Sequence, residues 1–310
     1  MGDAGRSLRG RHVSADPGSK AGSLGDWLSL VKFSHSIFAL PFALIALLLA
    51  TGGRPPLRML ALVVVAAVAA RTAAMAFNRW VDRDIDQRNP RTVSRELVTG
   101  KIGAPAALAL ALAASAIFLL ASGMLNALCA ALSPFVLIVL LGYSYTKRFT
   151  WACHLILGLA LALAPLGAWF AATGSFVHLT TPLLLAGAVL TWVAGFDVIY
   201  ACQDVDFDRS LGLRSIPARL GVRRALQVAR LLHVVTVALL ACFGVHTGLG
   251  VWWWVGYAAA CSLLVYEHTI VSPQDLSRVN AAFFTVNGCL SIVLAVLTAI
   301  DLWVAPIAPV

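Results

Sequence analysis

The sequence predicts an all-α integral membrane protein in which nine transmembrane helices form a bundle. Of its 310 residues, 60% are apolar and only 12% are charged, and the mean hydropathy is +0.86. A soluble domain carries roughly 25% charged residues, so this composition excludes a soluble enzyme, a disordered chain and a secreted disulfide scaffold. A bilayer span takes ~20 apolar residues, and runs of about this length recur along the chain. They are 33–51, 58–80, 104–123, 126–145, 152–173, 180–200, 226–246, 250–268 and 281–305.

Polar residues, or Gly and Pro, separate these runs and so define the elements in order. A Gly/Arg/Pro segment, 52–57, follows the first run. Two long charged segments, 81–103 and 201–225, follow the second and the sixth. The other connections are short, which favours antiparallel neighbouring helices.

Residues 1–26 differ in composition from the rest of the chain. They combine four Lys or Arg residues with Gly, Ser, Asp and Pro, and such a segment cannot bury enough apolar area to offset its chain entropy. We expect a disordered cytoplasmic tail here and a single nine-helix domain over 27–310. A cleaved signal peptide is the competing interpretation, but the run 33–51 is longer than the about 7–15 residues of a signal peptide's apolar core.

Basic residues are spread unevenly between the two sides of the predicted bundle. The tail, 79–101, 147–148 and 209–224 are rich in Lys and Arg, whereas the loops on the other side hold only Arg54 and Arg58. Because Lys and Arg gather in cytoplasmic loops, we expect a multi-pass protein with a cytoplasmic N-terminus. The same rule explains the net charge of +9. The charge reflects membrane topology and contact with anionic lipid rather than binding to nucleic acid. No obligate protein partner is indicated.

Two short stretches, 78–86 and 200–208, each hold three aspartates at alternate positions. In both, a polar residue stands four positions before the first aspartate, and a basic loop follows. The two stretches close predicted helices that share one orientation and lie four spans apart. We therefore expect an internal duplication with two motifs that face each other.

Residues four apart share one face of a helix, so Asn78, Asp82 and Asp86 form one stripe, and Asp204 and Asp208 form another. Carboxylates stacked in this way repel one another at membrane depth unless a positive charge lies between them. Carboxylate oxygens with an Asn carbonyl suit Mg²⁺, which shares its remaining positions with phosphate oxygens. The pattern predicts Mg²⁺ and a bound diphosphate. An exposed acidic helix end, or a proton or cation relay in a secondary transporter, is the alternative.

Basic and phenolic side chains near the two motifs extend the predicted phosphate site. Arg91 and Arg95 follow the first motif, and guanidinium groups bind phosphate oxygens in bidentate fashion. Each is also explained as an ordinary cytoplasmic loop charge. Lys147 follows Tyr143 by four residues, so both side chains can point to one side of a helix, and Tyr200 opens the second motif.

Two charged residues lie deeper, each seven positions before a polar residue of a motif. Arg71 precedes Asn78 and Asp197 precedes Asp204, and a charge inside the bilayer needs a partner. Arg71 either pairs with Asp197 as a structural bridge or presents its guanidinium to a substrate carboxylate. His35, in the first predicted helix, either lines the same cavity or hydrogen-bonds in the core.

These motifs resemble those of the UbiA superfamily of intramembrane aromatic prenyltransferases. The family's motifs N-D/R-x-x-D-x-x-x-D, D-x-x-x-D and Y-x-x-x-K all have counterparts, as does an arginine seven residues before the first motif. The matching residues are Asn78, Asp82 and Asp86; Asp204 and Asp208; Tyr143 and Lys147; and Arg71.

The resemblance implies a UbiA-like bundle around a central cavity, with cytoplasmic cap loops after the second and sixth helices. It also implies a polyprenyl diphosphate with its tail in that cavity, an aromatic acid similar to 4-hydroxybenzoate as the acceptor, and Mg²⁺ as the cofactor. The implied metal ligands are Asp82, Asp86, Asp204, Asp208 and Asn78; these aspartates and Lys147 are the implied catalytic residues. The implied substrate-binding residues are Arg71, Asn78, Arg91, Arg95, Tyr143, Asp197 and Tyr200.

Within the superfamily, four stretches look most like bacterial members of quinone biosynthesis. They are 32–41, 77–80, 91–97 and 197–204. This likeness implies a bacterial-type inner (cell) membrane, an active site toward the cytoplasm and a ubiquinone or menaquinone pathway. Many ubiquinone-pathway members place an Arg near the start of the first helix, where this chain has Lys32 and His35, so another family acceptor is the alternative.

Overall fold

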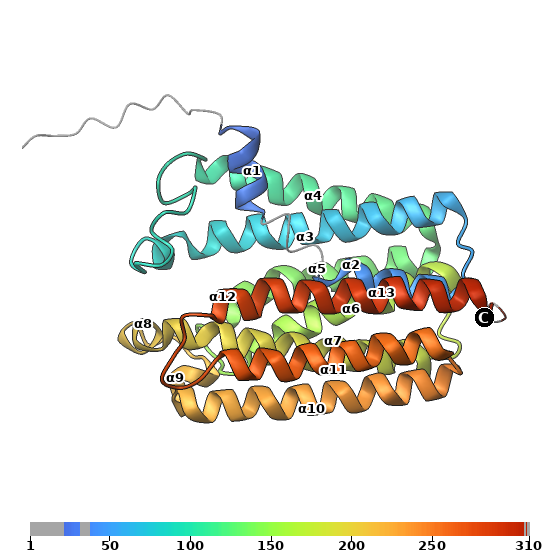
Figure 1. The fold of residues 1–310 in the computed structure, drawn as a ribbon. Coiled ribbons are helices and arrows are strands. Elements are labelled where there is room, and N and C mark those ends of the chain that lie inside the picture. The colour runs from blue at the N-terminus through green and yellow to red at the C-terminus, as the bar shows by residue number, and fades with distance from the viewer. Residues whose placement is uncertain (1–21, 32–37, 307, 309–310) are drawn as a thin grey trace, which may run out of the picture.

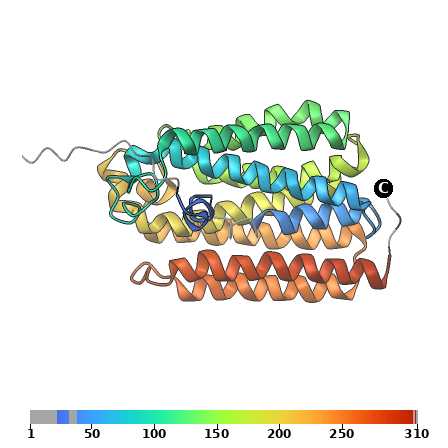
Figure 2. The same cartoon turned by 90° about the horizontal axis from the view of Figure 1, so that it is seen from above.

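The computed structural model describes residues 22–31, 38–306 and 308. The expected tail up to residue 21, and Lys32 and His35, lie outside the described residues. Regular structure in the described part of the chain is entirely helical. Long helices lie side by side along one direction (Figure 1), and the view from above shows that they form several layers (Figure 2).

The helices begin and end close to the predicted breaks. The first elements are α1 Leu24–Leu30, α2 Leu40–Ala50, α3 Leu57–Asp86, α4 Ala104–Leu125, α5 Ala127–Thr146 and α6 Cys153–Thr173. They are followed by α7 Thr180–Ala201, a 3₁₀ turn Cys202–Asp204, α8 Val205–Ser210, α9 Ile216–Leu220, α10 Val222–Thr247 and α11 Val251–Ile270. The chain ends with α12 Val279–Ala281, a π-helical turn Ala282–Val286 and α13 Asn287–Val304.

Seven segments of the described chain are long and apolar enough to cross a membrane, which makes this a multi-pass membrane protein. They are α3, α4, α5, α6, α10, the segment from α7 through α8, and the segment from α12 through α13. Helix α2 has 11 residues, about 16 Å at 1.5 Å per residue, against a hydrocarbon core of about 30 Å. Helix α11 is less apolar because it contains three Trp, two Tyr, a Glu and a His. The structure therefore supports seven spans, and the predicted count of nine is not established.

Small residues bring the helices around α7 into close contact. A Cβ atom at Gly158 in α6 would lie 2.3 Å from the Leu190 carbonyl oxygen of α7, and one at Gly195 in α7 would lie 2.3 Å from His233 Nε2 of α10. Neither position accepts a side chain without movement of its neighbour. Backbone approach at glycine is a common way to pack helices in a membrane, where lipid is as apolar as leucine.

The two acidic motifs end their helices differently. Helix α3 continues six residues past its predicted end at 80 and keeps Asn78, Asp82 and Asp86 on one continuous helix. Helix α7 instead stops at Ala201, and a 3₁₀ turn separates it from α8. The prediction of one helical stripe for Asp204 and Asp208 is therefore wrong, because Asp204 ends the 3₁₀ turn and Asp208 lies in α8. Both motifs lie at the same end of the bundle (Figure 1).

Candidate active site

Asp82 is the most heavily bonded acid of the first motif and is 2% exposed. Its carboxylate lies 2.8 Å from Lys147 Nζ and 3.0 Å from a guanidinium nitrogen of Arg148, and it accepts a hydrogen bond of 3.0 Å from Asn78 Nδ2. Both cations come from the end of α5, where Arg148 also donates to the Ser144 carbonyl. Cations are favoured at a helix C-terminus, where free carbonyls gather.

Asp86 accepts both of its bonds from one arginine that lies nine residues further on. A guanidinium nitrogen of Arg95 lies 2.6 Å from each carboxylate oxygen of Asp86. The Thr92 hydroxyl donates to the Asp86 carbonyl at 3.0 Å, so the segment after α3 folds back over the end of its own helix. The loop thereby supplies the charge that a buried carboxylate requires.

The same loop also reaches the second motif. Asp204 accepts 3.0 Å and 2.9 Å hydrogen bonds from Asn89 Nδ2 and Arg91 Nε, and Arg91 donates a further bond of 2.9 Å to the Tyr200 hydroxyl. Burial lowers the pKa of Arg91, but its bonds to Asp204 and Tyr200 outweigh that effect and raise the pKa above its ordinary value. Arg91 therefore ties the loop after the first motif to the second motif through a fixed positive charge.

Asp208 has a different kind of partner. It accepts a 2.9 Å hydrogen bond from the hydroxyl of Ser215, which also caps the first turn of α9. Next to this cap, the backbone N–H of Arg214 donates to the Lys147 carbonyl at 2.7 Å. The loop after the second motif therefore packs on the residue whose side chain holds Asp82. We refer to the four aspartates Asp82, Asp86, Asp204 and Asp208 and their Lys and Arg partners as the acidic cluster.

Asp197 pairs with a histidine rather than with Arg71. His154 Nδ1 of α6 lies 2.6 Å from Asp197 Oδ2, and the backbone N–H of Ile216 donates to His154 Nε2 at 3.3 Å. A backbone N–H can only donate, so this geometry suits a neutral ring whose proton lies on Nδ1, toward Asp197. The structural bridge between Arg71 and Asp197 is absent from the described contacts.

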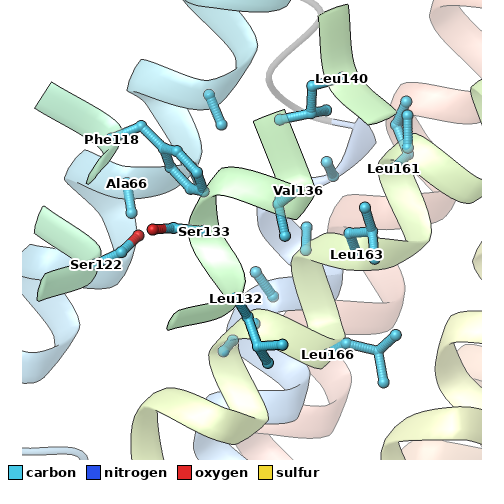
Figure 3. Close-up of a pocket in the computed structure, with 18 of the residues that line it drawn as sticks. Ala66, Phe118, Ser122, Leu132, Ser133, Val136, Leu140, Leu161, Leu163 and Leu166 are labelled. Atoms are coloured by element: carbon cyan, nitrogen blue, oxygen red, sulfur yellow. The ribbon is translucent and has the colours of Figure 1, made fainter. Parts of the chain in front are cut away.

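An apolar cavity of about 390 Å³ lies among α2 to α6. Its wall is formed mostly by leucine, valine and alanine side chains, and the hydroxyls of Ser122 and Ser133 lie on it (Figure 3). Tyr143 and Arg71 also line it, and Arg71 Nε is buried without a hydrogen-bond partner among the described residues. Tyr143 lies one helical turn before Lys147, and Arg71 about two turns before Asn78. The cavity and the acidic cluster therefore share α3 and α5.

The donor set of the acidic cluster fits Mg²⁺, since carboxylate and amide oxygens are the ligands that this ion takes in proteins. In the described part of the chain, however, no group of three or more His, Cys, Asp or Glu side chains converges on one point. Three of the four aspartates bind Lys or Arg instead. A divalent cation at this site would take over carboxylate oxygens that the chain's own cations hold.

Sequence reasoning did not single out four partners in this site: Arg148, Asn89, His154 and Ser215. Arg148 is adjacent to Lys147 at the end of a predicted helix, which is a usable signal. Asn89 and His154 meet acids that are 115 and 43 residues away, and no spacing rule connects such distant positions.

Comparisons with known proteins identify the family of the chain. A model of the UbiA prenyltransferase family matches residues 39–289. The 4-hydroxybenzoate octaprenyltransferase of Paraburkholderia xenovorans (strain LB400) is 34% identical over 261 residues, which cover 83% of this chain and 90% of that protein.

Solved structures show the same fold. The apo structure of a UbiA homolog from Aeropyrum pernix K1 has a TM-score of 0.79 at 37% identity and covers 86% of this chain and 98% of its own. A UbiA homolog from Archaeoglobus fulgidus bound to GPP and Mg²⁺ has a TM-score of 0.68 at 20% identity, with 90% and 99% coverage. The protein is a membrane-embedded prenyltransferase, and the chain belongs to the UbiA prenyltransferase family.

Proposed function

We propose that the protein transfers a polyprenyl group from a polyprenyl diphosphate to 4-hydroxybenzoate or a closely similar aromatic acid, with Mg²⁺, as a step of ubiquinone or menaquinone biosynthesis. The observation that carries this proposal is the acidic cluster at the ends of α3 and α5, two helices that also form the wall of an apolar cavity lined by a buried arginine. The name of the relative from P. xenovorans supports the acceptor. The homolog bound to GPP and Mg²⁺ supports the donor class and the metal.

The acidic cluster is the proposed diphosphate site. Asp82, Asp86, Asp204 and Asp208, with Asn78, would hold Mg²⁺, which supplies positive charge to the departing diphosphate. The cations that now neutralise these acids are Lys147, Arg148, Arg91 and Arg95. They would turn to the phosphate oxygens as the carboxylates take up the metal. Donors that are already in place lower the free energy of the charge that develops on the leaving group.

The cavity is the proposed site of the prenyl tail and the aromatic ring. Its apolar wall keeps water away from the allylic carbon, so the aromatic ring and not water forms the new bond as the C–O bond to the diphosphate breaks, and the ring then loses a proton. Arg71 has an unpartnered Nε in this wall and would bind the acceptor's carboxylate, with Tyr143 beside it. Asp197, oriented by His154, and Tyr200, bonded to Arg91, do not line this cavity and would contact the substrates from α7.

We further propose that residues 27–310 form one prenyltransferase domain in a bacterial-type inner membrane. The Lys- and Arg-rich connections 79–101, 147–148 and 209–224 lie at the end of the bundle that carries the acidic cluster. The positive-inside rule places this end in the cytoplasm.

One assay tests the reaction directly. Membranes that contain the protein are given a labelled polyprenyl diphosphate and a panel of aromatic acids, with Mg²⁺ or with EDTA, and the products are identified by mass spectrometry. We expect a prenylated 4-hydroxybenzoate that forms only with Mg²⁺. A prenylated product from a different acceptor would replace the proposed substrate, and no prenylated product from any member of the panel would overturn the proposal.

A further inference from the structure

A second buried polar network lies outside the acidic cluster and joins three helices. Glu267 of α11 and Asn287 of α13 are 0% exposed, and Trp192 of α7 is 1% exposed. Asn287 Nδ2 donates to Glu267 Oε1 at 3.0 Å, and Asn287 Oδ1 accepts from Trp192 Nε1 at 2.6 Å. Polar groups are costly at this depth, and nothing in the proposed chemistry uses these three.

The network holds a π-helical turn in place. The turn Ala282–Val286 lies directly before Asn287, and Asn287 Nδ2 also donates to the Ala282 carbonyl at 3.0 Å. A π turn is rare, and it disrupts the α-helical pairing of backbone carbonyls. The Asn287 amide supplies a partner to the carbonyl at the start of this turn, so it stabilises the widened geometry.

The π turn also packs on Tyr200, which bonds to Arg91 of the acidic cluster. Phe283 lies in it, and the ring centroid of Phe283 is 4.3 Å from that of Tyr200. The Tyr200 hydroxyl accepts from Arg91 at 2.9 Å, and the guanidinium lies 5.1 Å from the centre of the Tyr200 ring. A continuous series of contacts therefore runs from Asn287 through Phe283 and Tyr200 to Arg91. In Figure 1, α12 and the start of α13 lie at the same end of the bundle as α8 and α9.

We propose that Asn287 is a positioning residue: held by Glu267 and Trp192, it fixes the π turn so that Phe283 sets the Tyr200 ring and, through it, Arg91 against Asp204. This inference rests on the proposed function in that Arg91 binds the diphosphate. If the turn relaxed to α-helical geometry, the register would change by one residue, which is about 100° of rotation about the helix axis. Phe283 would then leave Tyr200, and Arg91 would lose the ring on which it lies.

The test compares Asn287→Leu, which removes every hydrogen bond of the amide, with two matched variants. Glu267→Gln keeps a side-chain oxygen that accepts from Asn287, so it should behave like the wild type. Thr298→Val changes another buried polar residue of α13 whose hydroxyl donates only within its own helix. We expect Asn287→Leu to raise the KM for polyprenyl diphosphate by about tenfold, the effect of one charge-assisted contact. The KM for the aromatic acid should stay within about twofold.

A double-mutant cycle separates positioning from general stabilisation. Arg91→Gln alone should raise the diphosphate KM, and adding Asn287→Leu to it should produce no further rise if both changes act on the same contact. Independent, multiplying effects, or an Asn287→Leu variant that loses thermal stability with an unchanged diphosphate KM, would overturn the inference.

A readout without catalysis keeps this test distinct from that of the proposed function. Inorganic pyrophosphate with Mg²⁺ should raise the Tm of the wild type, and the rise should be smaller for Asn287→Leu but not for Thr298→Val. A wild type that forms no prenylated acid contradicts the proposed function, whatever the variants do. An equal rise in Tm with pyrophosphate for the wild type and for Asn287→Leu would contradict the positioning role.

Discussion

Each aspartate of the first motif takes its positive partner from a different segment. Asp82 binds the end of α5, whereas Asp86 binds the loop that follows its own helix. A buried carboxylate is costly unless it is paired and hydrogen-bonded. These pairs therefore keep the motif stable without a metal ion and also keep phosphate-binding groups beside it. Asp84 lies between the two, but its side chain is 79% exposed and its only described ion pair is with the neighbouring Arg83.

This contrast between neighbours gives a matched pair of variants. Asp82→Asn should lower Mg²⁺-dependent prenyl transfer by at least about 100-fold, since a buried carboxylate that would hold the metal beside the leaving diphosphate is lost. Asp84→Asn removes an equal charge two residues away and should leave transfer within about twofold, because its exposed pair contributes little. Rates measured in membranes at saturating Mg²⁺ decide the matter. Equal losses in the two variants would contradict the assignment of Asp82.

Arg71 offers a test of acceptor recognition. Its buried Nε has no described partner, so a substrate carboxylate would satisfy it. Arg71→Gln should raise the KM for 4-hydroxybenzoate by about 10- to 100-fold, the range for a charge-assisted contact, and should change the diphosphate KM little. For an acceptor without the carboxylate group, the KM should not rise further in the variant. A rise confined to the diphosphate KM would instead place Arg71 at the donor.

Among the elements, the segment 87–103 joins the two motifs. It folds over the end of α3, and its Asn89 and Arg91 bind Asp204 while its Arg95 binds Asp86. The segment is therefore placed by the same carboxylates that a metal ion would use. A loop fixed by such pairs becomes free to move when a stronger cation takes the acids.

Competition between Arg95 and the metal ion predicts opposite effects on two ligands. Arg95→Gln should bind Mg²⁺ alone more tightly, by about three- to tenfold, because Asp86 no longer has a competing guanidinium. The same variant should bind pyrophosphate more weakly, because a phosphate-binding group is lost. Calorimetric titration of the purified protein with each ligand measures both constants. A loss of affinity for both ligands would show that Arg95 does not compete with the metal.

Sequence periodicity predicted α3 better than it predicted α7. The spacing of Asn78, Asp82 and Asp86 defines a stripe because residues four apart share a face, and α3 extends through all of them. Asp204 and Asp208 have the same spacing, but Asp204 ends a 3₁₀ turn and Asp208 lies in the next helix. No local feature of the sequence predicts this turn. The π turn before Asn287 is equally hidden, because its stabilising partners Trp192 and Glu267 are 95 and 20 residues away.

For the whole molecule, the mean hydropathy of +0.86 was enough to predict a helical membrane bundle, but it did not fix how many helices cross the bilayer. Helix α2 is short, and α11 carries polar and aromatic residues that reduce its hydropathy. The cavity was expected only from the resemblance to a known family. Its volume depends on how α2 to α6 pack, and that packing involves many long-range contacts at once.

The cavity's dimensions give a prediction about the length of the prenyl chain. Gly167 of α6 lies on the cavity wall, and an added Cβ there would meet no atom within 4 Å. A leucine at this position therefore projects into the cavity and takes space that an apolar tail would use. Gly142 of α5 has equally open surroundings but does not line the cavity, so Gly142→Leu controls for the change in helix propensity.

With a series of polyprenyl diphosphates of increasing length, kcat/KM of Gly167→Leu for the longest members should fall by about tenfold, at roughly 0.8 kcal/mol for each buried methylene displaced. Its kcat/KM for the shortest members should be unchanged. Gly142→Leu should have the kcat/KM of the wild type for every chain length. A uniform loss across the series would mean that the tail does not pass Gly167 and that the prenyl chain lies elsewhere in the bundle.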